Sequence, residues 1–130
     1  MESTTSSALT NGVRVEVEST YRADQSAPAK QHWFFSYTIR ITNVGHETVQ
    51  LVSRHWIIID ATDHVEEVIG DGVVGQTPVL KPGEAFVYTS FCPLKTSKGS
   101  MRGTYQMVAS TGEQFDAEIA PFALAQYTVH

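Results

Sequence analysis

The sequence has a single cysteine, few basic residues and no long apolar segment, and each shortage excludes a class of protein. Its 130 residues include 9 lysines and arginines against 14 acidic residues, which gives a formal net charge of -5. Such a charge excludes the basic surface that nucleic acid or an anionic membrane requires. No run approaches the roughly 20 apolar residues that cross a bilayer. We therefore expect neither nucleic-acid binding nor membrane insertion.

The cysteine content also indicates the compartment. Because Cys92 is the only cysteine, the chain forms no internal disulfide and no Cys-x-x-Cys metal or redox pair. A reducing setting fits, and we expect a cytoplasmic protein. Residues 1–12 are rich in Ser and Thr and have neither the basic start nor the apolar run of a signal peptide. We predict a disordered tail over 1–12 and one domain over 13–130, since this length suits a single core.

Apolar and polar residues alternate with a period of two along most of the chain, and no stretch has a helical period. The alternation is clearest over residues 13–21 and 33–42. Further strands are expected over 49–59, 65–69, 85–92, 102–109, 115–119 and 122–127. We expect the strands on either side of residues 43–46 to form a long antiparallel hairpin. Seven or eight short strands predict an all-β, two-sheet antiparallel sandwich of the immunoglobulin or fibronectin type III kind, with a small closed barrel as the alternative.

Residues 70–78 contain the G-x-G-x-x-G pattern of dinucleotide-binding loops, through Gly70, Gly72 and Gly75. In those loops the pattern ends a strand and begins a helix, whose N-terminal N–H groups hold the pyrophosphate. Here prolines follow, and the segment has Asp71 but no Lys or Arg. One interpretation is a structural crossing between strands. The other is a backbone nest that binds the phosphates of a nucleotide, with Mg²⁺ masking the carboxylate.

Arg54 and Trp56 form the second candidate site. With unbroken alternation they lie on the strand face opposite Val49 and Leu51, although all four belong to one expected strand. A β-bulge that exchanges the faces would place Trp56 in the core and pair Arg54 with a carboxylate such as Asp60. The other interpretation is an exposed Arg/Trp patch that binds a protein partner. The sequence leaves both open.

Metal and catalytic sites have little support in the residue spacing. Asp63 with His64 is the pair that we would test for a metal, because Mg²⁺ prefers oxygen ligands and Co²⁺ accepts imidazole. No EF-hand or His-x-x-x-His spacing occurs, and we expect no resident cofactor. Ser90 and Cys92 have no histidine at a catalytic spacing, and there is no G-x-S-x-G elbow. We predict a protein that is not an enzyme.

Six segments match a known family in order along the chain: residues 35–43, 51–56, 70–75, 82–90, 101–105 and 115–124. In these the sequence resembles the ApaG family of small bacterial proteins. The resemblance implies a fibronectin type III-like fold, no known enzymatic activity, and a link to cobalt and magnesium tolerance or to nucleotide pyrophosphates. The sequence departs from the family at Phe91, where Gly is usual, at Asp71 and Gln76, where Glu is usual, and in residues 61–64, which lack an expected glycine.

Together the residues and the resemblance predict a non-enzymatic binding or interaction module associated with divalent-cation homeostasis. Its protein partner is unknown, and self-association through a sheet edge, giving a homodimer, stays open. The alternative is a small-molecule binder that holds a nucleotide pyrophosphate at Gly70, Gly72 and Gly75, together with Mg²⁺.

Overall fold

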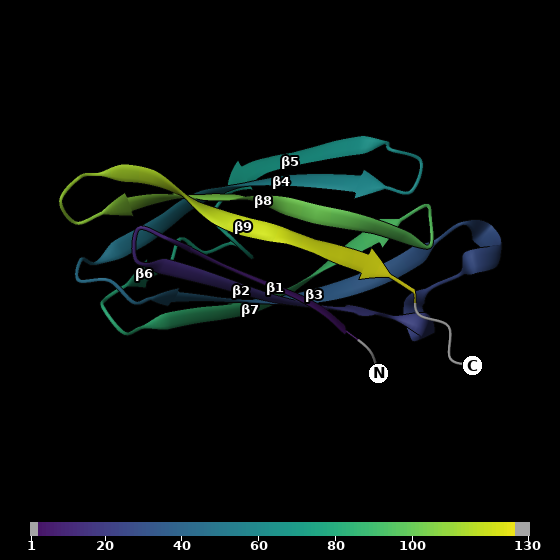
Figure 1. Cartoon of the computed structure of the whole chain (residues 1–130), viewed down its shortest axis with the longest axis horizontal. Coiled ribbons are helices and arrows are strands. Elements are labelled where there is room, and N and C mark those ends of the chain that lie inside the picture. Colours follow the sequence, from purple (N-terminus) through teal and green to yellow (C-terminus); the bar gives the residue numbers. More distant parts are fainter. Residues whose placement is uncertain (1–2, 127–130) are drawn as a thin grey trace.

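The computed structural model describes residues 3–126 and consists of two antiparallel β-sheets packed face to face (Figure 1). One sheet has the strand order β1-β2-β3-β7 and the other the order β5-β4-β8-β9, with β6 paired to β4. The elements are β1 (Ser3–Thr10), β2 (Val13–Tyr21), η1 (Ala23–Gln25), η2 (Pro28–Lys30), β3 (Trp33–Asn43), β4 (Val49–Asp60), β5 (Val65–Asp71), β6 (Val79–Leu80), β7 (Ala85–Leu94), β8 (Lys98–Ala109) and β9 (Gln114–Ala125). This is the predicted sandwich. Neither of the two short 3-10 helices in residues 3–126 could cross a bilayer.

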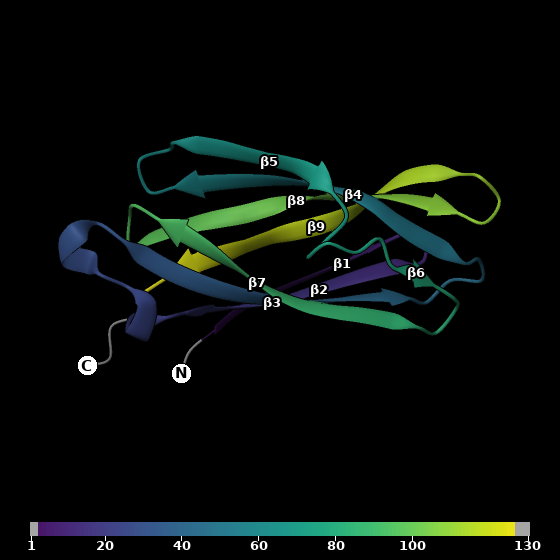
Figure 2. The same ribbon diagram turned by 180° about the vertical axis from the view of Figure 1, so that it is seen from behind.

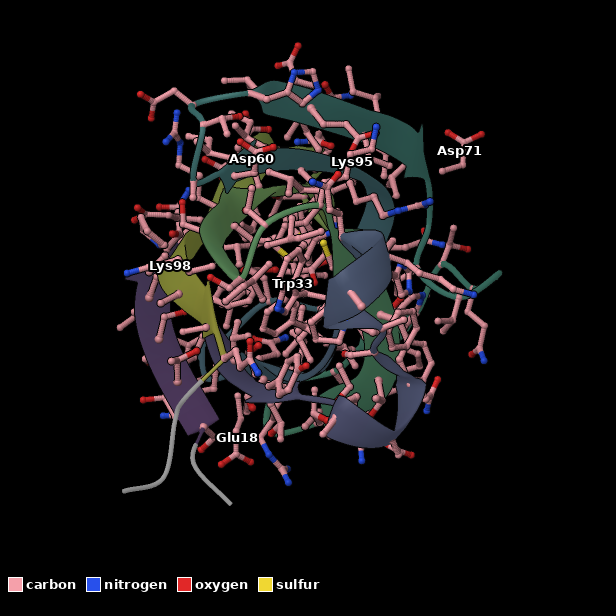
Figure 3. The ribbon with its side chains drawn as sticks, turned by 90° about the vertical axis from the view of Figure 1, so that its right-hand side faces the viewer. Glu18, Trp33, Asp60, Asp71, Lys95 and Lys98 are labelled. Carbon is pink, nitrogen blue, oxygen red and sulfur yellow. The ribbon has the colours of Figure 1, made fainter. Side chains whose placement is uncertain are left out.

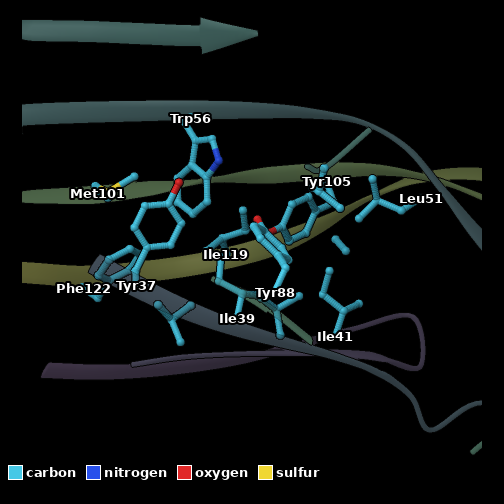
Figure 4. Close-up of a cluster of buried hydrophobic side chains, with 14 of the residues drawn as sticks. Tyr37, Ile39, Ile41, Leu51, Trp56, Tyr88, Met101, Tyr105, Ile119 and Phe122 are labelled. Atoms are coloured by element: carbon cyan, nitrogen blue, oxygen red, sulfur yellow. The ribbon is translucent and has the colours of Figure 1, made fainter. Parts of the chain in front are cut away.

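The inward-facing residues of both sheets form one hydrophobic core, as strand alternation requires. Val13, Val15 and Val17 of β2 are buried, as their period of two predicted. The residues labelled in Figure 4 come from both sheets and are all buried: Tyr37, Ile39 and Ile41 of β3, Leu51 and Trp56 of β4, Tyr88 of β7, Met101 and Tyr105 of β8, and Ile119 and Phe122 of β9.

Residues 3–10 form a strand, so the disordered tail predicted over 1–12 is wrong for this part; residues 1–2 lie outside the described residues. β1 pairs with β2 along its whole length. Asn11 and Gly12 join the two strands with φ angles of 45° and 78°, as a type I′ hairpin turn requires. Asn-Gly is a strong hairpin signal, and this strand could have been predicted from it.

β3 and β4 follow each other in the sequence but lie in different sheets, so the predicted hairpin between residues 33–42 and 49–59 is wrong. β3 pairs with β2 and β7, whereas β4 pairs with β5, β6 and β8. The buried Asn43 stabilises the crossing, because its Nδ2 donates to the carbonyls of Glu47 (2.7 Å) and Leu80 (2.9 Å). Alternation could not reveal this, because a strand buries every second residue in either sheet.

Two other predicted boundaries also differ from the structure. The separate strands expected at 115–119 and 122–127 belong to one strand, β9, within the described residues. Its register with β8 shifts between Met101 and Gly103, and Pro121 lies in this β-bulge, where a proline is tolerated. The expected turn at residues 98–100 is instead the beginning of β8.

The two lateral sides of the sandwich differ in how the sheets meet. On one side β1 lies against β9, and side-chain hydroxyls of β1 bond to the β9 backbone. Three bonds are formed, from Thr4 Oγ1 to the Ala123 carbonyl, from Ser6 Oγ to the Ala120 carbonyl (2.9 Å), and from the Glu118 N–H to Thr10 Oγ1 (3.1 Å). On the other side lie β5 and β7, each paired with a single strand within residues 3–126 (Figure 2). We call these the closed side and the open side.

Candidate functional site

The glycine segment, residues 70–78, leads from β5 to β6 and is held by its own backbone (Figure 2). The Gly72 N–H donates to a β4 carbonyl at 2.8 Å, and Val73 and Gln76 donate to each other's carbonyls at 2.8 and 2.9 Å. Between them Val74 and Gly75 have φ angles of 44° and 79°, which form a tight two-residue turn. Because the Val73 side chain is buried, the segment is anchored in the core.

Gly72 is required by close packing against the backbone, whereas Gly70 faces the end of the Arg54 side chain. At Gly72, which has a φ of +61°, a Cβ would lie 2.3 Å from the Gln76 carbonyl oxygen, and at Gly70 a Cβ would lie 2.9 Å from the Arg54 guanidinium. Gly75 has nothing within 4 Å of its Cβ position. Three N–H groups of the segment already donate to carbonyls, whereas an anion-binding nest must present such groups to its ligand. The geometry therefore supports the structural interpretation of the G-x-G-x-x-G pattern.

Arg54 lies half-buried beside the glycine segment. Its Nη1 donates to the carbonyl oxygens of Asp71 (3.0 Å) and Gly72 (2.9 Å). The expected pairing with Asp60 is wrong, because that carboxylate instead accepts hydrogen bonds in the turn between β4 and β5. Charge-assisted bonds to carbonyls are stronger than neutral ones, so Arg54 fixes the path of the chain as it leaves β5.

Trp56 is a core residue. The register between β4 and β8 shifts between Leu51 and Ser53, and this β-bulge exchanges the faces of β4 as one of the two interpretations predicted. Trp56 is 3% exposed, and its ring lies 5.4 Å from that of Tyr37, centroid to centroid (Figure 4). The exposed patch of Arg54 and Trp56 is therefore not formed in this structure.

Asp63 and His64 lie in the exposed turn between β4 and β5. Asp63 has a φ of 65° and is left-handed, in the turn at residues 61–64 for which the family resemblance implied a glycine. Asp60 Oδ1 accepts bonds from the Thr62 hydroxyl (2.6 Å), the Thr62 N–H (2.8 Å) and the His64 N–H (3.1 Å). These bonds, above all the one from the hydroxyl, lower the pKa of Asp60. Across residues 3–126, no three His, Cys, Asp or Glu side chains gather in a way that could hold a metal ion.

Three phenols and the thiol are buried between the sheets, with Tyr88 and Cys92 on β7, Tyr37 on β3 and Tyr105 on β8. Tyr88 Oη and Tyr105 Oη are 2.5 Å apart and hydrogen-bonded. Burial raises the pKa of both, and also that of Tyr37. Burial, with a smaller contribution from the Glu66 carboxylate, raises the pKa of Cys92 to about 12. Since the thiolate is the reactive form, Cys92 is a buried and unreactive thiol at neutral pH.

The sequence reasoning did not identify the surface of the open side, where β5 exposes apolar residues along a free edge. Val65 is 53% exposed, Val68 36% and Ile69 73%. Glu66 and Glu67 stand between them and are also exposed. An edge strand presents unpaired backbone groups to any chain that lies alongside it. The continuous mixture of apolar and acidic residues at 65–69, which lacks clean alternation, was the available signal in the sequence.

A groove of about 370 Å³ opens between the start of β5 and the end of β7. Figure 3 shows this end of the molecule, with Asp60 and Lys95 labelled. The groove is lined by apolar residues, charged residues and two imidazoles: Ile58, Pro93, Leu94, Asp60, Glu66, Lys95, His32 and His64. The structure thus brings His64 to a surface groove, whereas Asp63 is not among the lining residues.

Comparison with known proteins gives the family. The sequence model of the ApaG domain (DUF525) matches residues 23–109. The chain belongs to the ApaG family. Protein ApaG from Anaeromyxobacter dehalogenans (strain 2CP-C) is 59% identical over 119 residues, which cover 92% of this chain and 94% of the relative. Protein ApaG from Acidovorax sp. (strain JS42) is 55% identical over 116 residues, with 89% and 85% covered. A crystal structure of a Bordetella pertussis protein described as ApaA has a TM-score of 0.85 at 52% identity, covering 87% of this chain and 92% of that one.

The match to the ApaG domain covers the open side of the sandwich but not the two strands of the closed side. Residues 23–109 include β5, β7, the glycine segment and the groove, and so contain the whole open side. The two strands of the closed side, β1 and β9, lie outside the match. The two relatives from Anaeromyxobacter and Acidovorax carry only the name ApaG, a domain without a known enzymatic activity.

Proposed function

We propose that the protein is a non-enzymatic interaction module whose contact surface is the open side of the sandwich. The observation that carries the proposal is the free edge of β5, where Val65 and Ile69 are more than half exposed. Free edges recruit extended segments of other proteins by strand addition. Exposed apolar residues on such an edge favour association with another chain.

The difference between the two edges of this sheet supports the same conclusion. β9, at the far edge, is covered by β1 and bonded to its hydroxyls. β5, at the near edge, is covered by no strand within residues 3–126. The proposal includes a context: the module acts in the cytoplasm, as its single cysteine led us to expect, and in divalent-cation homeostasis, as the resemblance to the ApaG family implied, through a protein that it binds.

Site-specific photo-crosslinking tests this function. We would place p-benzoylphenylalanine at Ile69 on β5 and, as a control, at Thr5, which is exposed on β1, in cells that make the protein at its natural level. We expect a discrete crosslinked protein, identified by mass spectrometry, at Ile69 and not at Thr5. No product at Ile69, or the same products at both positions, would contradict the proposal.

The alternative function, a nucleotide pyrophosphate held at Gly70, Gly72 and Gly75 with Mg²⁺, has less support. Three N–H groups of the segment are already bonded, and the exposed Asp71 would repel phosphate. An NMR titration with a dinucleoside tetraphosphate, with and without Mg²⁺ or Co²⁺, tests it at the amides of the three glycines. Saturable shifts confined to this segment would replace the interaction module with the ligand binder.

A further inference from the structure

We propose that the partner contributes an extended segment that adds to β5 as an antiparallel strand and places a lysine or arginine beside Glu66. This inference rests on the proposed function and adds to it the sequence that the partner carries. The recognised segment reads apolar-apolar-basic-basic over four consecutive residues.

The backbone of β5 is suited to accept a strand. One edge pairs with β4 in an unbroken register from Asp71 to Val65. The other edge meets no strand within residues 3–126. Proteins commonly block such an edge with a proline, a charged side chain or a bulge. β5 has no proline, no basic residue and no register shift against β4. Its charges in the middle of the strand are Glu66 and Glu67, which only a chain carrying cations would neutralise. Backbone bonds then give affinity, and the side chains of the added strand give specificity.

Alternation assigns each side chain of the added strand to one of two faces. Val68 pairs with the inward-facing Trp56, so a residue opposite Val68 or Glu66 faces the gap between the sheets. A residue opposite Glu67 or Ile69 faces outward, beside the external surface of the same sheet.

The inward position beside Glu66 fits a long basic side chain. The groove at this point combines Ile58 and Leu94 with the carboxylates of Glu66 and Asp60. Lysine and arginine bury an apolar stem and keep the charged head in a polar setting. Within residues 3–126, the salt bridges do not involve Glu66, so its charge is available. Lys95 also lines the groove, and its charge would repel a basic side chain placed there. Replacing Lys95 with an acidic residue should therefore increase the affinity for a basic segment.

The remaining positions complete the pattern. Glu67 contacts the His55 Nε2 at 3.0 Å but is 57% exposed, and a cation opposite it would form a cross-strand ion pair. Ile69 and Val68 are both exposed, and apolar residues opposite them would remove their side chains from water. In an antiparallel strand, the partners of Ile69, Val68, Glu67 and Glu66 follow in that order from N to C, which gives apolar-apolar-basic-basic.

A second copy of this chain fits the same edge less well. β5 contains two glutamates and one aspartate but no basic residue. In an antiparallel pair of β5 strands, Glu66 and Glu67 would therefore meet no cation. Charge complementarity favours a basic segment of another protein.

The test is an NMR titration of ¹⁵N-labelled protein at pH 7.5 with the acetylated and amidated peptide Thr-Ile-Val-Lys-Lys-Thr. Two matched peptides carry glutamine or glutamate in place of both lysines. We expect saturable shifts at the amides of residues 65–70, binding about fivefold weaker with the glutamine peptide, and no saturable shift with the glutamate peptide.

Charge variants of the protein provide the matched controls. Glu66→Lys should weaken binding of the lysine peptide about fivefold or more, and Lys95→Glu should strengthen it. Glu113→Lys makes the same charge change in the turn between β8 and β9, at the opposite end of the sheet (Figure 1), and should leave binding unchanged. If Glu66→Lys does not fold, Glu66→Gln removes the charge at nearly constant shape and should weaken binding about twofold or more.

The possible outcomes distinguish a failure of this inference from a failure of the proposed function on which it rests. Equal shifts with the lysine and glutamine peptides would overturn the basic specificity and retain strand addition to β5. No saturable shift at residues 65–70 up to about 5 mM peptide, where binding of about -3 kcal/mol registers, would overturn the segment itself. If the crosslink at Ile69 also gives no product, the proposed function fails as well. A concentration-dependent dimer with residues 65–70 in its interface would identify a second copy as the occupant and overturn the inference.

Discussion

On the closed side of the sandwich β1 lies against β9, whereas on the open side β5 and β7 meet no further strand within residues 3–126. Both sides end in edge strands, whose free backbone groups would pair with any available chain. The side chains account for the difference. Ser6 and Thr10 are small enough for close approach and bond to the β9 backbone through their hydroxyls, while Val65 and Ile69 on β5 expose apolar surface. The same kind of edge is thus protected on one side and available for binding on the other.

The glycine segment modifies the open side without closing it. Arg54 and the buried Val73 hold it in place, and it runs from β5 to β6, which pairs with β4 in the same sheet (Figure 2). The groove at the other end of β5, near Glu66, stays open. The substitutions and conditions below test how far the two sides differ.

Alkaline pH should have the largest effect on stability, because four titratable groups are buried between the sheets, two of them on β7 of the open side. Burial raises the pKa of Cys92 above the ordinary thiol value of 9.0, and the pKa values of Tyr37, Tyr88 and Tyr105 above the ordinary phenol value of 10.0. Well below pH 9 the folded and unfolded chains both keep these protons, and the full stability is present. Above it the unfolded chain loses them first, so the free energy of unfolding falls as pH rises toward the folded pKa values.

At about 1.4 kcal/mol per pH unit for each group, we expect a loss on the order of 5 kcal/mol between pH 9 and 11. Urea unfolding at a series of pH values measures it. Cys92→Ala should remove the part of the decline that begins at pH 9. Constant stability from pH 8 to 11 would show that these groups are not buried as described.

Trp56→Ala tests whether the core extends under the open side. Since Trp56 is 3% exposed, its truncation should lower the free energy of unfolding by about 3–5 kcal/mol. Phe91→Ala is the comparison, because Phe91 is 50% exposed on β7 and stacks on Phe34 at 5.4 Å; its loss should be below about 1.5 kcal/mol. Urea unfolding measures both, and similar losses would contradict the assignment of Trp56 to the core.

Removal of the hydroxyls of β1 should weaken the closed side. The triple variant Thr4→Val, Ser6→Ala and Thr10→Val removes three hydrogen bonds to β9, and we expect a loss of about 3 kcal/mol, near 1 for each bond. The outward-facing pair Thr5→Val and Ser7→Ala is the control and should change stability by less than about 0.5 kcal/mol. Thermal unfolding distinguishes them, and equal shifts in Tm would indicate that the closing bonds have no net effect.

Gly72→Ala and Gly75→Ala should have the smallest effects and separate packing from backbone conformation in the glycine segment. Both positions have positive φ, but only Gly72 would bring a Cβ against a backbone oxygen, at 2.3 Å. We expect a loss of about 1 kcal/mol for Gly75→Ala, from the left-handed conformation alone, and at least about 2 kcal/mol for Gly72→Ala. Urea unfolding measures the pair; a larger loss at Gly75 would reverse the interpretation.

The local strand pattern was predictable, and most pairings were not. The alternation of β2 and β3 gave their limits and buried faces almost to the residue. β1 was missed although Asn11 and Gly12 mark its hairpin. The pairing of β3 with β4 was wrong, because alternation records which residues are buried and not which strand lies alongside.

In the candidate site, too, the local features were predictable from the sequence and the long-range contacts were not. The bulge that places Trp56 in the core was one of two interpretations that the sequence offered, since both faces of β4 carry apolar residues. The partner of Arg54 was not predictable, because it consists of backbone carbonyls at Asp71 and Gly72. The groove combines Ile58 with Leu94, residues that belong to different sheets and to distant parts of the chain.

The sequence by itself determined the all-β class, the alternating core residues and the resemblance to ApaG, because strand period, turn residues and ordered motifs are local properties of the chain. Only the tertiary structure decided which edges are covered. Whether β9 is protected and β5 left free depends on contacts between residues more than a hundred positions apart, such as Ser6 with Ala120. Such contacts are set by the packing of the two sheets, and no local pattern encodes them.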